Sequence, residues 1–151
     1  MADVVDHKTR SQMMAGIRGK NTRPEIHIRS LLHRHGFRFR IHVDSLPGKP
    51  DIVLKRYRAV IFIHGCFWHA HDCHLFKLPS TRTEFWQTKI EGNKERDTVN
   101  IKVLKDSGWR VLTIWECSLK GRTRLKESAL AEKISAWLSG DIPDSEITGR
   151  E

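Results

Sequence analysis

The chain alternates between helical and extended spacing of its hydrophobic residues. A capping-box pattern, Thr22-Arg23-Pro24-Glu25, marks the start of a helix, and Gly36 marks its end. Between these points Ile28, Leu31 and Leu32 recur at the spacing of one helix face. The pattern therefore predicts an amphipathic helix that packs this face against a core.

Four segments carry the patterns of β-strands. Hydrophobic and polar residues alternate over residues 37–43, which is typical of a half-buried strand. Two short apolar runs, residues 51–54 and 59–63, are separated by four residues and predict a hairpin. A fourth strand is expected at residues 109–115.

Three further helices complete the predicted order of elements. A short basic helix is expected at residues 10–18, a long helix from residue 84 towards 107 with Thr83 as its cap, and a last helix at residues 124–138. The resulting order is α-α-β-β-β-α-β-α. Because a hairpin precedes a strand that follows a long helix, this order predicts an α/β fold with a mixed central sheet flanked by helices.

The composition fits one soluble domain, residues 1–151, with an excess of positive charge. The chain has 27 Lys and Arg against 18 Asp and Glu, a net charge of +9, which favours a polyanionic partner such as nucleic acid. Residues 1–20 are basic and are expected to form a DNA-binding arm, whereas residues 141–151 are expected to be a frayed acidic tail.

The chain shows no sign of export or membrane insertion. No apolar run is long enough to span a membrane, and the first residues lack the apolar core of a signal peptide. The expected compartment is therefore the cytoplasm. Three Cys argue against a disulfide framework and leave metal binding or free thiols.

One segment of eleven residues holds four of the nine His and two of the three Cys. Zn²⁺ prefers Cys sulfur and His nitrogen in a tetrahedral arrangement. The candidate ligands are Cys66, His71, Cys73 and, after the last predicted strand, Cys117. His69 or His74 could take the place of His71. A closed Cys₃His set of this kind predicts a structural zinc site.

A second group of residues is expected where the two strands of the predicted hairpin meet. Asp51 begins one strand and Ile63 ends the other, so a carboxylate and a backbone carbonyl could hold one Mg²⁺ ion. Glu25, His64 and His69 are expected to converge on the same point. Such a set is suited to phosphodiester hydrolysis, in which a metal polarises the phosphate and a base activates water.

Aromatic residues fall into two groups. Phe67 and Trp68 lie inside the proposed zinc loop and Trp86 opens the long helix, and large apolar side chains beside basic residues can wedge between base pairs. We assign these three residues to such a wedge. The second group consists of aromatic residues that are expected in the core: Phe85, Trp109, Trp115 and Trp137.

Five longer motifs, taken together, are more specific than any single feature. They are, in chain order, Leu46-Pro47-Gly48-Lys49-Pro50-Asp51; Val60-Ile61-Phe62-Ile63-His64-Gly65-Cys66-Phe67-Trp68-His69; Thr81-Arg82-Thr83-Glu84-Phe85-Trp86; Asn93 with Glu95-Arg96-Asp97; and Gly108-Trp109-Arg110-Val111 leading to Trp115-Glu116-Cys117. In order and spacing they resemble the very-short-patch repair (Vsr-type) mismatch endonucleases.

This resemblance implies a restriction-endonuclease-like variant of the PD-(D/E)xK nuclease fold. It also implies Mg²⁺-dependent nicking of one DNA strand on the 5′ side of the T in a T:G mismatch, the lesion left when 5-methylcytosine deaminates. The implied partners are double-stranded DNA carrying that mismatch and a MutL-like repair protein, and the implied location is the bacterial cytoplasm near the nucleoid.

The resemblance also implies a role for individual residues. It makes Asp51 the metal carboxylate and His69 the base, with His64 and Glu25 in support. The implied zinc ligands are Cys66, His71, Cys73 and Cys117. The implied DNA contacts are the wedge of Phe67, Trp68 and Trp86, the arm near Met14, and Lys89 and Asn93 as readers of the mismatch. One departure stands at position 63, where Ile replaces the expected Thr.

Two other interpretations stay open. A restriction-type endonuclease that dimerises and cuts both strands would have a similar composition. A zinc-stabilised DNA-binding module without catalysis would leave Asp51, Glu25 and His69 unexplained. The favoured interpretation is a monomeric endonuclease with a single active site, which predicts a nick rather than a double-strand cut.

Overall fold

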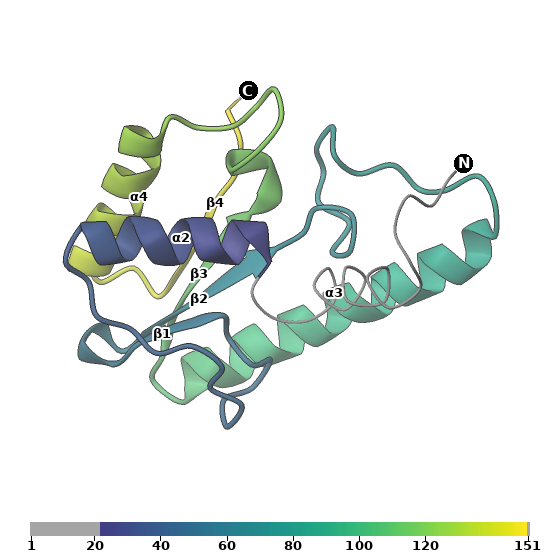
Figure 1. The fold of residues 1–151 in the computed structure, drawn as a ribbon. Helices are drawn as coiled ribbons and strands as arrows, with labels where there is room; N and C mark the ends of the chain where they lie inside the picture. Colours follow the sequence, from purple (N-terminus) through teal and green to yellow (C-terminus); the bar gives the residue numbers. More distant parts are fainter. Residues whose placement is uncertain (1–21, 151) are drawn as a thin grey trace, which may run out of the picture.

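A four-stranded mixed sheet forms the centre of the protein (Figure 1). The computed structural model describes residues 22–150, so the predicted helix at residues 10–18 and Met14 lie outside the described residues. The strands, in spatial order, are β1 (Ile52–Leu54), β2 (Ala59–His64), β3 (Arg110–Trp115) and β4 (Asp144–Ile147). β1 is antiparallel to β2, whereas β2, β3 and β4 are mutually parallel. The predicted mixed sheet is confirmed.

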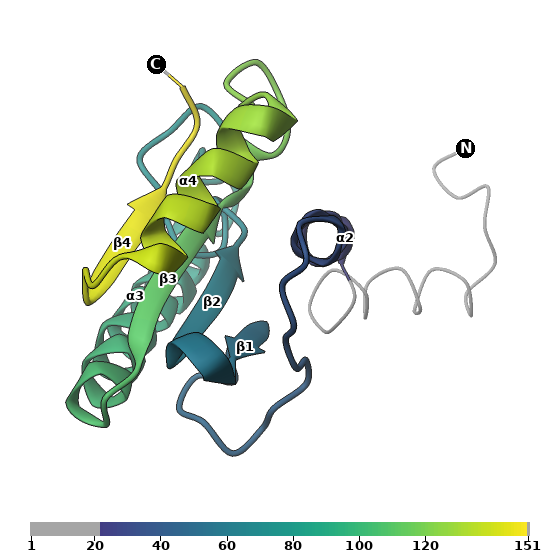
Figure 2. The same cartoon turned by 90° about the vertical axis from the view of Figure 1, so that its left-hand side faces the viewer.

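Helices cover both faces of this sheet (Figure 2). They are α2 (Arg23–Arg34), α3 (Thr83–Asp106) and α4 (Glu127–Ser139). Side chains alternate along β2: Ala59 and Ile61 belong to the core that contains α2 and α4, whereas Val60 and Phe62 pack in a second core with Leu104 of α3. The period-two alternation of a strand thus divides the apolar residues between two layers.

The predicted hairpin is present as β1 and β2. Its register pairs Ile52 with Ile61 and Leu54 with Ala59. The link between the strands is a 3-10 turn, η1 (Lys55–Tyr57), followed by Arg58 in the left-handed conformation with φ of 51°. A second 3-10 turn, η2 (Glu116–Ser118), follows β3.

The ends of α2 follow the sequence signals. The Glu25 backbone N–H donates to Oγ1 of Thr22 at 3.4 Å, and Pro24 lies in the first turn, as its missing N–H allows. The helix ends at Arg34, and Gly36 adopts a φ of +83° just beyond it. The capping prediction for this helix is confirmed.

Helix α3 is long but buries little of its surface. Only Ile90 and Leu104 of its 24 residues are fully buried, because its first half extends beyond the edge of the sheet (Figure 1). None of the helices among residues 22–150 has the length and apolar character needed to cross a membrane.

The strand expected at residues 37–43 is absent. Arg40 makes an isolated bridge to Val53, with backbone N···O distances of 2.8 and 2.9 Å. His42 then adopts a left-handed φ of 58°, which ends the extended conformation. Phe37 and Phe39 still pack against the core, so the alternation predicted which side chains are buried but not a strand.

The acidic tail is not frayed as expected. Residues 144–147 form β4, which pairs in parallel with β3 and buries Ile147 to 5% exposure. Glu146 accepts a 3.1 Å hydrogen bond from Nε1 of Trp115. The tail therefore covers the edge of β3, which would otherwise be left unpaired.

Arg110 connects the sheet to the end of α4. Its guanidinium stacks 4.2 Å from the ring of Trp137 and donates to the carbonyls of Trp137, Leu138 and Ile142. The carbonyls of Trp137 and Leu138 lie in the last turn of α4, where carbonyls lack partners further along the helix, although Trp137 also accepts from the Gly140 N–H at 3.2 Å. Arg110 therefore acts as a side-chain cap for that helix.

Arg110→Lys is expected to lower the free energy of unfolding by about 2 kcal/mol, because an ammonium cannot stack on Trp137 and reach all three carbonyls. Urea unfolding followed by circular dichroism measures the change. Arg56→Lys, at an exposed position of η1, is the matched control and should stay within about 0.5 kcal/mol of the unaltered protein. Equal stability of both variants would contradict the capping role.

Candidate active site and metal centre

Asp51 lies immediately before β1 and faces the end of β2. Its Oδ2 accepts a 2.6 Å hydrogen bond from the backbone N–H of Ile63. Because the N–H and C=O of a strand residue point towards the same neighbour, the Ile63 carbonyl also faces Asp51. The Ile63 side chain instead packs against the hydrophobic core. A cation at Asp51 would therefore meet the backbone of residue 63.

Burial raises the pKa of Asp51 to about 7, which is the largest influence on this carboxyl. The Ile63 N–H lowers the pKa, the carboxylate of Glu25 raises it, and the Arg29 guanidinium lowers it. Glu25 is itself buried to 6% exposure, and its Oε2 lies 2.9 Å from Nη2 of Arg29. Two neighbouring buried carboxyl groups make a site in which a bound cation would favour the ionised forms.

Two histidines stack beside this carboxylate. The rings of His64 and His69 are 3.9 Å apart and 5° from parallel. Nδ1 of His69 bonds Oδ2 of Asp97, and Nε2 of His64 lies 4.0 Å from Oδ1 of the same residue. Burial, followed by the neighbouring His69, lowers the pKa of His64 to about 3. His64 is therefore neutral at neutral pH.

Asp97 has no role assigned from the sequence, although one of the quoted motifs contains it. It lies on α3, 28 positions from His69, so only the packing of α3 against the loop brings the two together. The sequence feature that could have indicated a role for Asp97 is its four-residue spacing from Asn93, which places both side chains on one face of the helix.

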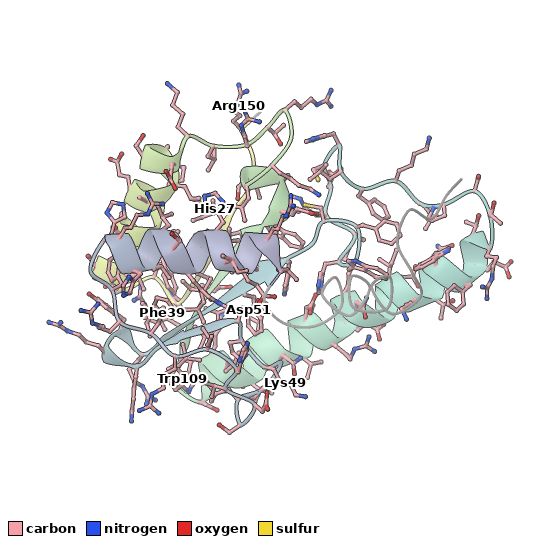
Figure 3. All side chains as sticks on the ribbon, in the orientation of Figure 1. His27, Phe39, Lys49, Asp51, Trp109 and Arg150 are labelled. Carbon is pink, nitrogen blue, oxygen red and sulfur yellow. The ribbon has the colours of Figure 1, made fainter. Side chains whose placement is uncertain are left out.

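The predicted catalytic residues line one cleft. Asp51 lies between α2 and α3 in the view of Figure 3. The cleft is lined by the predicted residues Glu25, Asp51, Ile63, His64, Phe67, Trp68, His69, Lys89 and Asn93, and also by Asp97. The structure thus brings the carboxylate before β1 and the imidazole beside Trp68 to a common cavity, next to the aromatic side chains.

A second metal-ligand set lies at the adjacent end of the sheet. The ligand atoms of Cys66, His71, Cys73 and Cys117 all lie within 4.8 Å of one another. His69 and His74, the two alternatives to His71, are outside this set. Cys66 and Cys117 come directly after β2 and β3, two parallel neighbours, which explains why residues 51 positions apart meet.

The distances within this set fit Zn²⁺. Sγ of Cys66 and Sγ of Cys117 each lie 3.5 Å from Nδ1 of His71. A tetrahedral ion with bonds of about 2.3 Å to sulfur and about 2.0 Å to nitrogen places those ligands roughly 3.5 Å apart. Burial raises the pKa of the Cys66 and Cys117 thiols and lowers that of His71, so in this setting a cation is needed to hold the thiolates.

Trp115 packs against the ligand set. Its ring stacks on that of His71 at 4.1 Å and 12°. The loop between Cys66 and His71 contains Phe67, Trp68 and His69, so the ligand set fixes both ends of the segment that carries the histidine and two of the aromatics. The expected core position of Trp115 is confirmed, because it is 8% exposed.

The three aromatics predicted as a wedge form one cluster. The ring of Phe67 lies 5.2 Å from that of Trp68 and 5.6 Å from that of Trp86, and the two tryptophans are 5.8 Å apart. All three are only partly buried. They lie at the end of α3 that extends beyond the sheet, where a rigid apolar surface is open to a ligand.

The expectation that Phe85 lies in the core is wrong. It is 45% exposed, and the guanidinium carbon of Arg82 lies 4.3 Å from its ring. The first turn of α3 has no sheet beneath it, so its apolar residues are not covered. Trp137 is buried and Trp109 packs against the second core, as expected.

The predicted mismatch readers differ in their surroundings. Asn93 donates from Nδ2 to the backbone carbonyl of Trp68 at 2.9 Å, and its Oδ1 accepts from Arg96. Lys89 is exposed. Asn93 therefore supports the loop that carries Trp68. Lys89 also lines the cleft, where its side chain is exposed.

A partly buried carboxylate at the edge of a mixed sheet, in one cleft with a histidine that is paired with a second carboxylate, suits metal-assisted hydrolysis. A sequence profile for DNA mismatch endonuclease Vsr matches residues 2–75. DNA mismatch endonuclease Vsr of Escherichia coli (strain K12) is 50% identical over 147 residues, which are 97% of this chain and 94% of that protein. The chain belongs to the Vsr family of DNA mismatch endonucleases.

Two further relatives carry a related name. Type II nicking enzyme V.XorIIP of Xanthomonas oryzae pv. oryzae is 48% identical over 119 residues, covering 79% of this chain and 88% of that protein. Type II nicking enzyme V.NmeAIP of Neisseria meningitidis serogroup A is 42% identical over 127 residues, covering 84% and 91%. The family assignment thus extends over most of the chain.

Proposed function

We propose that this endonuclease nicks one strand of duplex DNA on the 5′ side of the T in a T:G mismatch, with Mg²⁺ as its cofactor. The observation that carries the proposal is the shared cleft, in which Asp51, the His69–Asp97 pair and the aromatic side chains lie together. Membership of a mismatch endonuclease family supports the choice of lesion.

The proposed Mg²⁺ ligands are the Asp51 carboxylate and the Ile63 carbonyl, which lies on the same side of β2 as the N–H that Asp51 accepts from. A bound ion would polarise the scissile phosphate and offset charge on the leaving oxygen. Ile in place of Thr leaves this pair intact, because only the backbone of residue 63 faces Asp51.

His69 is the proposed general base. Asp97 engages Nδ1 of His69, which leaves Nε2 to accept a proton from the attacking water. His64, which is neutral, stacks on His69 and holds its ring plane, and Glu25 places a second carboxylate beside Asp51. His64 and Glu25 are therefore proposed to support the base or to position water bound to the metal.

The proposed zinc site is structural. Its four ligands, Cys66, His71, Cys73 and Cys117, fill a tetrahedron and leave no position for substrate. By fixing both ends of the loop, the ion would hold His69 and the wedge residues in one arrangement.

The proposed wedge of Phe67, Trp68 and Trp86 selects the lesion by deformation. A T:G wobble pair is easier to unstack than a Watson–Crick pair, so inserting an aromatic surface costs less there. Lys89 and Asn93 are the proposed readers of the mismatch, and the arm near Met14 is proposed to reach round the other groove. A single site in one chain is consistent with the proposed monomer that leaves a nick. A MutL-like repair protein is the proposed partner.

A strand-resolved nicking assay tests the proposal. Duplexes with T:G, T:A or C:G at one position, in several flanking sequences and with each strand labelled separately, are incubated with and without Mg²⁺. We expect cleavage only of the T-containing strand of the T:G duplex, 5′ of the T, and only with the metal. Cleavage of both strands would favour the restriction-type alternative, and no cleavage would favour the DNA-binding module.

Trp68→Ala is expected to reduce the preference for T:G over T:A duplex by roughly 5- to 100-fold in binding, since one aromatic contact to a base is worth about 1–3 kcal/mol. Affinity for matched duplex should change much less. Fluorescence anisotropy with both duplexes measures the ratio. Val99→Ala, which removes an exposed apolar side chain of α3 outside the cleft lining, is the control. Equal losses on both duplexes would count against a wedge.

A further inference from the structure

We propose that the last residues of the chain hold the zinc site closed, and that Gly149 is a positioning residue for the thiolate of Cys117. The segment concerned, here called the C-terminal strap, is residues 148–150. The inference rests on the proposed zinc site. Figure 1 shows the strap leaving β4 and running beside the segment that follows β3.

The main contact is a hydrogen bond to a ligand atom. The backbone N–H of Gly149 donates to Sγ of Cys117 at 3.3 Å. A metal-bound thiolate keeps much of its negative charge, so a backbone N–H directed at the sulfur stabilises it and fixes its orientation. Cys117 comes from the sheet and the N–H comes from the chain end, so the bond ties the two together.

The close approach requires glycine at position 149. A Cβ atom there would lie 2.5 Å from Oγ1 of Thr123 and 2.6 Å from the backbone carbonyl oxygen of Cys117. Those two atoms already form a 2.9 Å hydrogen bond with each other. Any side chain would therefore push the strap away from the sulfur or break this bond.

Arg150 secures the far side of the strap. Its backbone N–H donates to the Thr123 carbonyl at 2.8 Å. Its guanidinium donates to the carbonyls of Arg122 and Arg124 at 2.8 and 3.2 Å. Three hydrogen bonds to one loop hold Gly149 in place between that loop and the ligand cysteine.

The segment before the strap supports a second ligand. Glu146 of β4 accepts a hydrogen bond from Trp115, and Trp115 stacks on His71. Ile147 pairs with Ile114 at the end of the parallel ladder. The C-terminal residues thus contact the surroundings of two proposed zinc ligands, which gives the acidic tail a role beyond covering the sheet edge.

The test compares two glycine substitutions in the full chain. Gly149→Ala introduces the clash, whereas Gly140→Ala places a Cβ no closer than 3.4 Å to any neighbour and serves as the matched control. Zinc release to an excess of a chromophoric chelator is followed by absorbance, with circular dichroism to verify folding. We expect release to be about 10- to 100-fold faster in Gly149→Ala, the usual cost of losing an outer contact to a metal ligand. Gly140→Ala should match the unaltered protein.

A spectroscopic readout separates positioning from general stability. In the Co²⁺-substituted protein the thiolate-to-metal charge-transfer band should shift in Gly149→Ala and stay unchanged in Gly140→Ala. If Gly149→Ala does not fold, Arg150→Ala, which keeps the Gly149 N–H but loses the side-chain anchor, should still show faster release. Equal release rates and unchanged bands would overturn the inference.

The unaltered protein distinguishes this inference from the proposals on which it rests. Purified protein that contains no zinc would overturn the zinc site and the strap together. Protein that contains zinc and releases it no faster after Gly149→Ala would overturn the strap alone. Nicking of the T:G duplex, measured on the same preparation, decides the proposed activity independently.

Discussion

Asp51→Asn is expected to lower the rate of strand nicking by at least about 10³-fold while leaving affinity for a T:G duplex nearly unchanged. Loss of a metal carboxylate removes several kcal/mol of transition-state stabilisation, and each 1.4 kcal/mol is about tenfold in rate. In the proposed function, DNA binding depends instead on basic and aromatic residues. Single-turnover nicking and anisotropy measure the two effects, with Asp106→Asn, an exposed Asp on α3, as control.

The same substitution should stabilise the protein when no Mg²⁺ is bound at Asp51. Because burial raises the pKa of Asp51 to about 7 from 3.8, the folded state binds this proton more tightly than the unfolded chain does. The ionised carboxyl therefore destabilises the fold increasingly as pH rises from about 4 to about 7. Asp51→Asn should raise the free energy of unfolding at pH 8 by on the order of 2 kcal/mol, and the gain should vanish near pH 4.

These two results separate catalysis from structure. A variant that loses nicking because it is misfolded would also lose stability and DNA binding. Urea unfolding at pH 5 and pH 8, without added Mg²⁺ and without a chelator that would remove the proposed zinc ion, tests the pH dependence. If Asp51→Asn nicks at the unaltered rate, or is less stable at pH 8, the assignment of Asp51 as a buried metal carboxylate is wrong.

Removal of the proposed zinc ion is expected to unfold the protein. A structural zinc ion contributes about 10 kcal/mol or more to folding, and domains have a net stability of only about 5–15 kcal/mol. Cys117→Ser should act in the same way, because Cys117 is 2% exposed and its sulfur lies inside the ligand set. Metal analysis, tryptophan fluorescence and circular dichroism before and after chelation measure the loss.

His74→Ala is the matched control for this prediction. His74 is close in sequence to the ligands but lies outside the ligand set, whereas His71 lies inside it. We expect His71→Ala to lose zinc and cooperative unfolding and His74→Ala to keep both. A folded, zinc-free protein would refute the structural site, and loss of zinc in His74→Ala alone would show that the ligand is misassigned.

Local sequence patterns predicted the elements that depend on local interactions. The capping pattern at Thr22 and the apolar runs of the hairpin each specify one element through nearby residues. The ligand spacing around Cys66 predicted a loop, but three histidines could serve as its nitrogen ligand. The backbone path of that loop turns His71 towards the sulfur atoms and His69 towards Asp97. The spacing of the residues alone does not predict which histidine is the ligand.

The features that the sequence did not predict depend on contacts between distant segments. Asp97 meets His69 only because α3 crosses the sheet. β4 has an acidic sequence typical of a tail, and it becomes a strand by pairing in parallel with β3. At His42 the alternation of residues suits a strand, but the left-handed backbone ends it. In each case tertiary structure overrides the local preference.

Asp51 and His69 are proposed to act around one divalent cation in the shared cleft. Electron paramagnetic resonance of Mn²⁺, titrated into the complex of the protein with a T:G duplex whose scissile phosphate resists hydrolysis, tests it most directly. We expect a bound Mn²⁺ signal that disappears in Asp51→Asn and is altered in His69→Ala, but persists in Trp68→Ala. Undiminished Mn²⁺ binding in Asp51→Asn would contradict it.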